Sequence, residues 1–269
     1  MPFTEHLAEL RLRLRNAVLA VLLATAGAWL FRIELYGILI RPLARAWAQA
    51  PPDLPREITF TNLIDPFMVY FKLALLAGVF AASPAIFHQV WRFIAPGLYP
   101  RERRLALPFI LLSVLLFCGG ALFAFYFVLP ASYGYFLSFC SSSLGEMRTL
   151  LNHEQVPVST ELFRLRPMLT MDEYFGLTST LLLLFGAVFE LPLLLSALAL
   201  FGIVTPGGLW RFNRYAILIF FILGAILTPG DLVVGQLAMG SALTVLYNLS
   251  ILAALLMQRQ KDEVPATAR

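Results

Sequence analysis

Residues 101–130 read RERRLALPFILLSVLLFCGGALFAFYFVLP, a charged tetrapeptide followed by an apolar segment that contains no charged residue. The hydrocarbon core of a bilayer is about 30 Å thick, and a helix rising about 1.5 Å per residue needs about 20 apolar residues to cross it. Residues 105–130 meet this requirement. The stretch therefore predicts a membrane-crossing helix that follows a short hydrophilic break.

The composition of the whole chain agrees with this interpretation. Of its 269 residues, 59% are hydrophobic and 13% are charged, whereas soluble domains have about half and about a quarter. An ordinary soluble domain is excluded, and a polytopic membrane protein is indicated. The formal net charge of +4 does not indicate a nucleic-acid partner, because the arginines are dispersed among loops instead of forming one stripe.

Six apolar segments predict an all-α integral membrane protein with six transmembrane helices in a single domain. The segments are Asn16–Phe31, Phe67–Val90, Leu105–Pro130, Tyr174–Phe201, Tyr215–Leu227 and Leu232–Met257. Proline and glycine mark the breaks between them, as in Thr205-Pro206-Gly207-Gly208. The fifth segment would reach only about 20 Å, so it is predicted to be too short to span comfortably.

The distribution of arginine and lysine predicts the orientation of the chain. Four short regions carry these residues on one side: 1–15, 91–104, 202–214 and 258–269. The other side has two longer loops, 32–66 and 131–173, where positive charge has less weight. The positive-inside rule therefore places both termini in the cytoplasm.

The amino end allows two interpretations. The basic run Arg11–Arg15, the apolar residues after it and the small residues Ala24–Ala26 are similar to a cleavable signal peptide. Against this, the leucines at 7, 10 and 14 recur at helical spacing within residues 4–14. We therefore expect residues 1–15 to form a cytoplasmic amphipathic helix.

Two carboxylates, Glu9 and Glu102, are predicted near one membrane face, each beside arginines. Carboxylates bind guanidinium groups through paired, charge-assisted hydrogen bonds, so the two acids suit a cationic peptide ligand. In the alternative interpretation Glu9 pairs with Arg13, and Glu102 pairs with its own neighbouring arginines, as solvated surface ion pairs.

Two further charged residues fall inside predicted spans. Glu190 lies deep in the fourth span, where an ionised acid costs at least about 2.5 kcal/mol, so it should face protein or a water-filled recess. It is either a polar site in a groove or a neutral acid bonded to a neighbouring helix. Lys72 lies one turn inside the second span, and we expect it to extend to the outer interface.

Several motifs along nearly the whole chain resemble the TatC family, the multi-spanning subunits of the twin-arginine protein translocase. They are HLAELRLRL at 6–14, QVWRFIAPGLY at 89–99 followed by ERR at 102–104, FGAVFELP at 185–192, GIVTP at 202–206 and LTP at 227–229. The resemblance implies a receptor in the bacterial inner membrane that binds the twin-arginine signal peptides of folded cargo. It further implies assembly with single-span TatA- or TatB-like subunits, homo-oligomers within the complex, and transport driven by the proton motive force.

Carried to this chain, the resemblance makes Glu9 and Glu102 the signal-peptide contacts. Three more residues would shape the same surface: Phe93, Arg103 and Arg104. It also implies that the last two helices are short, with a polar turn between them where a partner helix docks. The matching polar residues here are Thr228, Asp231 and Gln236. At position 248 this chain has asparagine, where the family often has glutamate.

No sequence motif indicates an enzyme, a metal site or a cofactor. The chain has no metal-ligand spacing, no glycine-rich phosphate loop and no nucleophile motif. Cys118 and Cys140 are predicted at different membrane depths, so we expect no disulfide between them. The competing functions are a proton-coupled secondary transporter with Glu190 as its relay, and a passive structural anchor of a membrane complex.

Overall fold

The structure is a computed structural model that describes residues 3–50, 56–94, 106–138, 168–200, 204–227 and 234–262. Within these ranges the chain is helical apart from loops and one isolated β-bridge between Thr59 and Thr170. Five of the helices are long and apolar enough to cross a membrane, and Gln236–Leu252 is a shorter apolar helix. The predicted all-α class is confirmed, while the number of spans and the side of the termini stay predictions.

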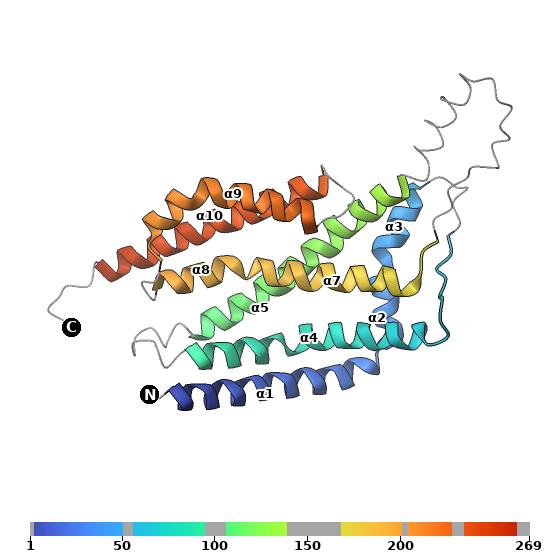
Figure 1. The fold of residues 1–269 in the computed structure, drawn as a ribbon, viewed down its shortest axis with the longest axis horizontal. Coiled ribbons are helices and arrows are strands. Elements are labelled where there is room, and N and C mark those ends of the chain that lie inside the picture. Colours follow the sequence, from blue (N-terminus) through green and yellow to red (C-terminus); the bar gives the residue numbers. More distant parts are fainter. Residues whose placement is uncertain are drawn as a thin grey trace, which may run out of the picture.

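Most helices run back and forth along one direction, as Figure 1 shows. They are α1 (Phe3–Trp29), α4 (Asp65–Ile94), α5 (Ala106–Phe123), α7 (Met171–Phe189), α8 (Leu191–Leu200), α9 (Pro206–Leu227) and α10 (Val234–Asp262). Two short helices, α2 (Arg32–Leu39) and α3 (Arg41–Gln49), lie across them at one end. We call this the opposite end. The other is the N-terminal end, where α1 begins, α4 and α8 end, and α5 and α9 begin.

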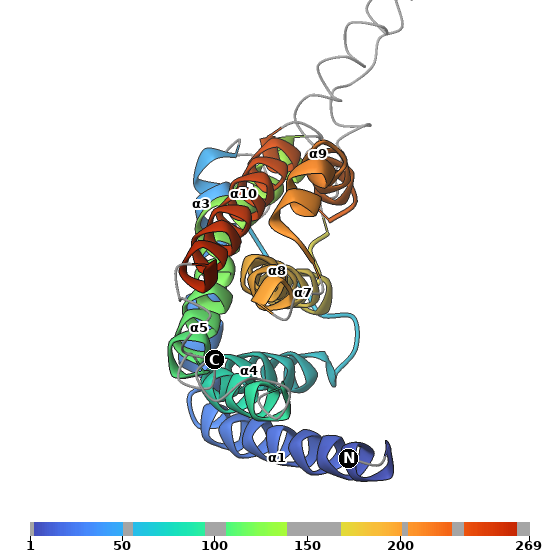
Figure 2. The same cartoon turned by 90° about the vertical axis from the view of Figure 1, so that its left-hand side faces the viewer.

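The helices are arranged as two outer pairs with others between them. Viewed from one end of the bundle in Figure 2, α1 packs along α4 on one side, and α9 packs along α10 on the other. The pair α7 and α8 lies between these two groups, with α5 beside it. Only 6% of the apolar window of α1 is buried, so this helix is at the margin of the bundle.

The fifth and sixth helices are longer than predicted. The fifth helix, α9, has 22 residues and begins at Pro206, not at Tyr215, and α10 has 29 residues. The Thr205 hydroxyl accepts a hydrogen bond of 3.1 Å from the backbone N–H of Gly208, which is the contact of an N-cap. Proline suits the first turn of a helix because its missing N–H is not needed there. The Thr-Pro-Gly-Gly break therefore starts a helix, and part of the predicted 202–214 loop is helical.

The third helix also continues past its predicted end. After α5 the chain makes a π-helical turn, Ala124–Val128 (η3), and stays helical to Ser138. The backbone N–H of Leu129 bonds to the carbonyl oxygen of Ala124, five residues earlier. This wide turn ends two residues before Pro130, which lacks an N–H and would end an ordinary helix. The predicted loop 131–173 thus begins later than expected.

At the amino end, the predicted amphipathic helix and the first span form one continuous helix, α1. The predicted loop 32–66 contains α2 and α3. The hydroxyl of Tyr174 on α7 donates to the carbonyl oxygen of Leu39 at 2.6 Å, and the hydroxyls of Tyr133 and Thr178 are 2.8 Å apart. All three side chains are buried, so these bonds fix the opposite end of the bundle.

Glycines allow two helix pairs to approach closely. A Cβ added to Gly120 on α5 would lie 2.4 Å from the carbonyl oxygen of Phe185, and one on Gly186 of α7 would lie 2.8 Å from the Phe117 ring. A Cβ on Gly78 of α4 would lie 2.3 Å from the hydroxyl oxygen of Thr25 on α1. Close backbone approach at small residues is the usual packing of membrane helices.

We predict that Gly120→Ala destabilises the fold whereas Gly119→Ala does not. The first change inserts a methyl group against the backbone of α7, and such overpacking costs about 1–3 kcal/mol. A Cβ on Gly119 meets nothing within 4 Å. The thermal unfolding midpoint of the purified protein in detergent is the measurement, and equal midpoints for the two variants would contradict the contact between α5 and α7.

Candidate functional site

The first predicted carboxylate lies at the N-terminal end of the bundle and is already paired. Nη2 of Arg13 contacts Oε1 of Glu9 at 2.9 Å within α1, and the two side chains are 17% and 23% exposed, respectively. The arrangement agrees with the alternative interpretation of Glu9 as one member of a helical ion pair. It also leaves Nε of Arg13 buried without a partner among the described residues.

The second carboxylate, Glu102, lies outside the described residues together with Arg103 and Arg104. The helices on either side of that segment are held together at the N-terminal end. The rings of Trp91 on α4 and Phe109 on α5 lie 4.6 Å apart and are buried with Leu193 and Ala197 of α8. Phe93 is half-buried near the end of α4, an end that lies beside the start of α1 in Figure 1.

Glu190 lies between α7 and α8 and faces α5. Its backbone N–H bonds to the carbonyl oxygen of Ala187 at 3.2 Å, where α7 ends. The Ser113 hydroxyl and the backbone of Phe117, both on α5, lie next to its carboxyl group. This geometry agrees with an acid bonded to a neighbouring helix. Its Oε1 is buried without a partner among the described residues, which leaves the polar-site interpretation open.

Of the three residues predicted at the partner-docking turn, only Gln236 lies within the described part of the chain. Thr228 and Asp231 lie outside it. Nε2 of Gln236 donates to the carbonyl oxygen of Phe221 at 3.1 Å. The side chain therefore connects the start of α10 to α9, an intramolecular contact that its sequence position did not predict.

Further polar contacts between α9 and α10 were not predicted. Nδ2 of Asn213 donates to Oδ1 of Asn248 at 3.1 Å, and the Tyr247 hydroxyl donates to the carbonyl oxygen of Leu209 at 2.9 Å. The unusual Asn248 was the available signal, because an amide can both donate and accept across a helix interface. These bonds fix the rotation of α9 against α10.

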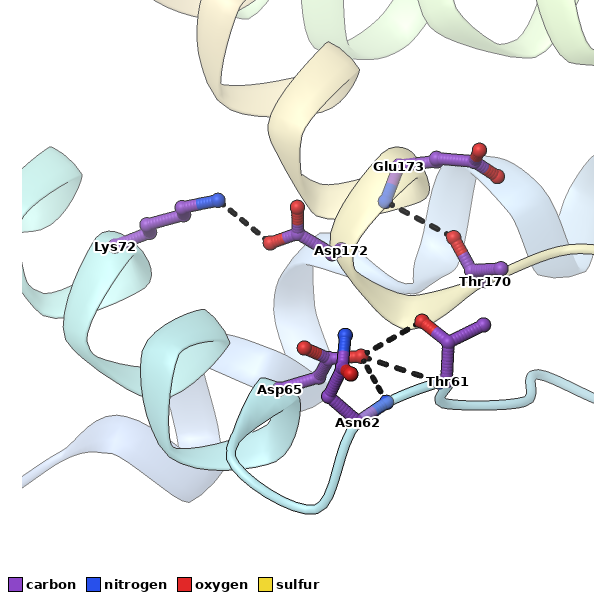
Figure 3. Close-up of polar contacts among 7 residues, drawn as sticks. All are labelled: Thr61, Asn62, Asp65, Lys72, Thr170, Asp172 and Glu173. Atoms are coloured by element: carbon purple, nitrogen blue, oxygen red, sulfur yellow. Dashed lines mark hydrogen bonds and ion pairs between the residues drawn. The ribbon is translucent and has the colours of Figure 1, made fainter.

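At the opposite end, polar contacts connect α4 to the start of α7 (Figure 3). Nζ of Lys72 contacts Oδ1 of Asp172 at 2.5 Å. Lys72 thus reaches a carboxylate at the start of α7. Both side chains are nearly half exposed, so the pair contributes about 0–1 kcal/mol.

The loop before α4 is fixed by the same group of contacts. Oδ2 of Asp65 accepts hydrogen bonds from the backbone N–H groups of Thr61 and Asn62 at 3.1 and 2.8 Å. The β-bridge adds two backbone hydrogen bonds, of 2.9 Å from Thr59 N–H to Leu169 and 2.7 Å from Met171 N–H to Thr59. Within the described ranges, no cluster of histidine, cysteine, aspartate or glutamate could hold a metal ion.

Three comparisons bear on this arrangement. Residues 5–241 match the family model described as Sec-independent protein translocase protein (TatC). A protein of that name from Desulforapulum autotrophicum is 38% identical over 97% of this chain and 87% of its own length. A protein of the same name from Aquifex aeolicus is 35% identical over 98% of this chain and 99% of its own length.

A solved structure gives the same result for the fold. The crystal structure of the twin-arginine translocase receptor TatC in the detergent DDM superposes with a TM-score of 0.69 at 33% identity. The alignment covers 93% of this chain and 99% of that one.

Proposed function

The chain belongs to the TatC family of Sec-independent protein translocase subunits, and from this premise we propose that the N-terminal end of its bundle binds twin-arginine signal peptides. The family is one of transport proteins, not enzymes. The match over residues 5–241 is the observation that carries the proposal. It favours a protein translocase over a secondary transporter or a passive anchor.

Glu9 and Glu102 are the proposed contacts for the two ligand arginines, with Phe93, Arg103 and Arg104 shaping the same surface. Glu9 and Phe93 support this assignment by their positions on adjacent helix ends at the N-terminal end. The short Glu102 segment connects α4 to α5, whose ends are joined by the Trp91–Phe109 contact. Two separated anions, one on α1 and one in the segment between α4 and α5, suit a ligand with two guanidinium groups.

Arg13 gives the proposed site a defined resting state. Arg13 contacts only Oε1 of the Glu9 carboxylate. The second carboxylate oxygen can therefore accept a hydrogen bond from a ligand guanidinium. A ligand arginine therefore joins or replaces a guanidinium that is already present. The exchange avoids a resting state in which a partly buried anion has no partner.

The remaining proposals concern partners and orientation. Single-span TatA- or TatB-like subunits dock at the turn that carries Thr228, Asp231 and Gln236, and copies of the chain associate within the complex. Glu190 serves as a polar site at the centre of the bundle. Both termini lie in the cytoplasm of a cell whose inner membrane holds the protein, and the proton motive force drives transport.

Glu9→Ala and Glu102→Ala should each weaken cross-linking of a twin-arginine peptide about tenfold or more. Each change leaves a ligand guanidinium without its anion, and hydrogen bonds to charged groups are worth about 1.5–3 kcal/mol. The matched control is Glu57→Ala, which removes an exposed carboxylate from the loop before α4. Normal cross-linking and export by the double variant, at equal protein level, would refute the receptor site.

Gln236→Leu should reduce co-purification of a single-span partner and spare cross-linking of the peptide at Glu102. The change removes a polar group at the proposed docking turn. Ser241→Ala is the control on the same helix, because the exposed Ser241 hydroxyl bonds only within α10, to the carbonyl oxygen of Ala238. Since Gln236 also bonds to α9, the unfolding midpoint must be unchanged for partner loss to support docking.

Orientation can be measured by cysteine labelling in a Cys118→Ser, Cys140→Ser background. Glu57→Cys should react with an impermeant maleimide added to intact cells. Arg92→Cys, at the N-terminal end, should react only after the membrane is permeabilised. The reversed pattern would contradict the proposed orientation.

A further inference from the structure

The first turns of α9 present two arginines on the face that points away from α10. Three contacts define the inward face: Leu209 and Asn213 hydrogen-bond to α10, and the Phe220 ring lies 5.6 Å from the Tyr247 ring. At 100° per residue, Arg211 and Arg214 fall on the other side of the helix. Both side chains are exposed.

Neither arginine has an anionic partner in the described part of the chain. The ion pairs found there are Arg13–Glu9 and Lys72–Asp172, and α9 itself contains no acidic residue. Arg214 is positioned by a neutral neighbour: its Nη2 donates to the Tyr215 hydroxyl at 2.8 Å, and its guanidinium carbon lies 4.6 Å from the centre of that ring. As far as the described residues go, the two guanidinium groups are therefore available to an anion.

Further along α9 toward its C-terminal end, the same helix face is apolar and exposed. Leu218 and Ile222 follow at helical spacing and are 60% and 51% exposed. Two aromatic residues flank the arginines, namely Trp210, which is 65% exposed, and Tyr215. Tryptophan and tyrosine at this position are typical of the boundary between lipid headgroups and acyl chains. The face thus combines cations, interfacial aromatics and an apolar stripe in the order in which a phospholipid presents its groups.

We propose that this face, defined by Arg211, Arg214, Leu218 and Ile222, is a binding site for an anionic phospholipid. The headgroup phosphate accepts hydrogen bonds from Arg211 and Arg214, and an acyl chain packs along Leu218 and Ile222. The argument for a lipid over a protein helix is the charge pattern, because guanidinium groups pair with phosphate in a fixed fork geometry. The proposal does not depend on which side of the membrane holds this end.

Native mass spectrometry of the delipidated full-length chain in detergent tests the proposal. Phosphatidylglycerol is the anionic probe, and phosphatidylcholine is the zwitterionic one. We expect the first phosphatidylglycerol to bind more tightly than phosphatidylcholine. Arg211→Gln with Arg214→Gln should weaken the binding of phosphatidylglycerol about thirtyfold, because each arginine near an anionic surface contributes about 1 kcal/mol. Equal binding of the two lipids would overturn the proposal.

The matched control is Arg11→Gln with Arg15→Gln, which removes the same charge from exposed positions on α1. It should leave the affinity of the first phosphatidylglycerol nearly unchanged, and an equal loss there would show diffuse attraction instead of a site. Arg211→Lys with Arg214→Lys keeps the charge but loses the fork geometry, so it should weaken binding less than the glutamine pair does, at an unchanged unfolding midpoint. If the glutamine pair instead lowers co-purification of a single-span partner and leaves the lipid affinity unchanged, the face belongs to that partner and the proposal is wrong.

Discussion

The contact between α5 and α7 at Gly120 and Gly186 is the packing constraint on which the centre of the bundle depends. Helices in lipid gain little from burying apolar side chains against one another, because lipid is equally apolar. Association must come from close van der Waals contact and from hydrogen bonds. With no side chain at positions 120 and 186, the Phe185 carbonyl and the Phe117 ring occupy the space that a Cβ would take. The same approach brings Glu190 to Ser113 and Phe117.

Several polar side chains within the helices bond to neighbouring helices, while other hydroxyls bond within their own helix. Tyr133 with Thr178, and Asn213 with Asn248, are hydrogen-bonded across helix interfaces. In water such bonds would compete with solvent, whereas in a bilayer the alternative is an unsatisfied polar group. They specify rotation and register where apolar packing alone specifies little. The consequence for function is that α9 turns a fixed face outward, with its arginines and its exposed leucine and isoleucine together.

Much of the fold could be predicted from the sequence, because membrane helices follow from long apolar segments. The start of α9 could not be predicted, because Thr205-Pro206-Gly207-Gly208 contains residues that are common both where helices end and where they begin. The hydrogen bond from Gly208 to the Thr205 hydroxyl shows that this stretch begins a helix. The end of the third helix was missed because a π-turn precedes Pro130. Of the candidate site, the alternative pairing of Glu9 with Arg13 followed from four-residue spacing. The hydrogen bond between Gln236 and Phe221 could not be predicted from spacing, because it depends on how α9 and α10 cross.

The state of Glu9 suggests why a receptor of this kind would favour a ligand with two arginines over one. In the proposed site, a single guanidinium would gain less at Glu9 than at a free carboxylate, because it competes with Arg13 for an anion that is already paired at 2.9 Å. A second guanidinium on the same peptide would reach Glu102 in the proposed site without a further loss of translational freedom, so its contribution would add to the first almost in full. Affinity then rises steeply with the second arginine. In the proposed site, this partly buried ion pair would thus discriminate against the many single arginines of other proteins, while the resting site keeps its charge compensated.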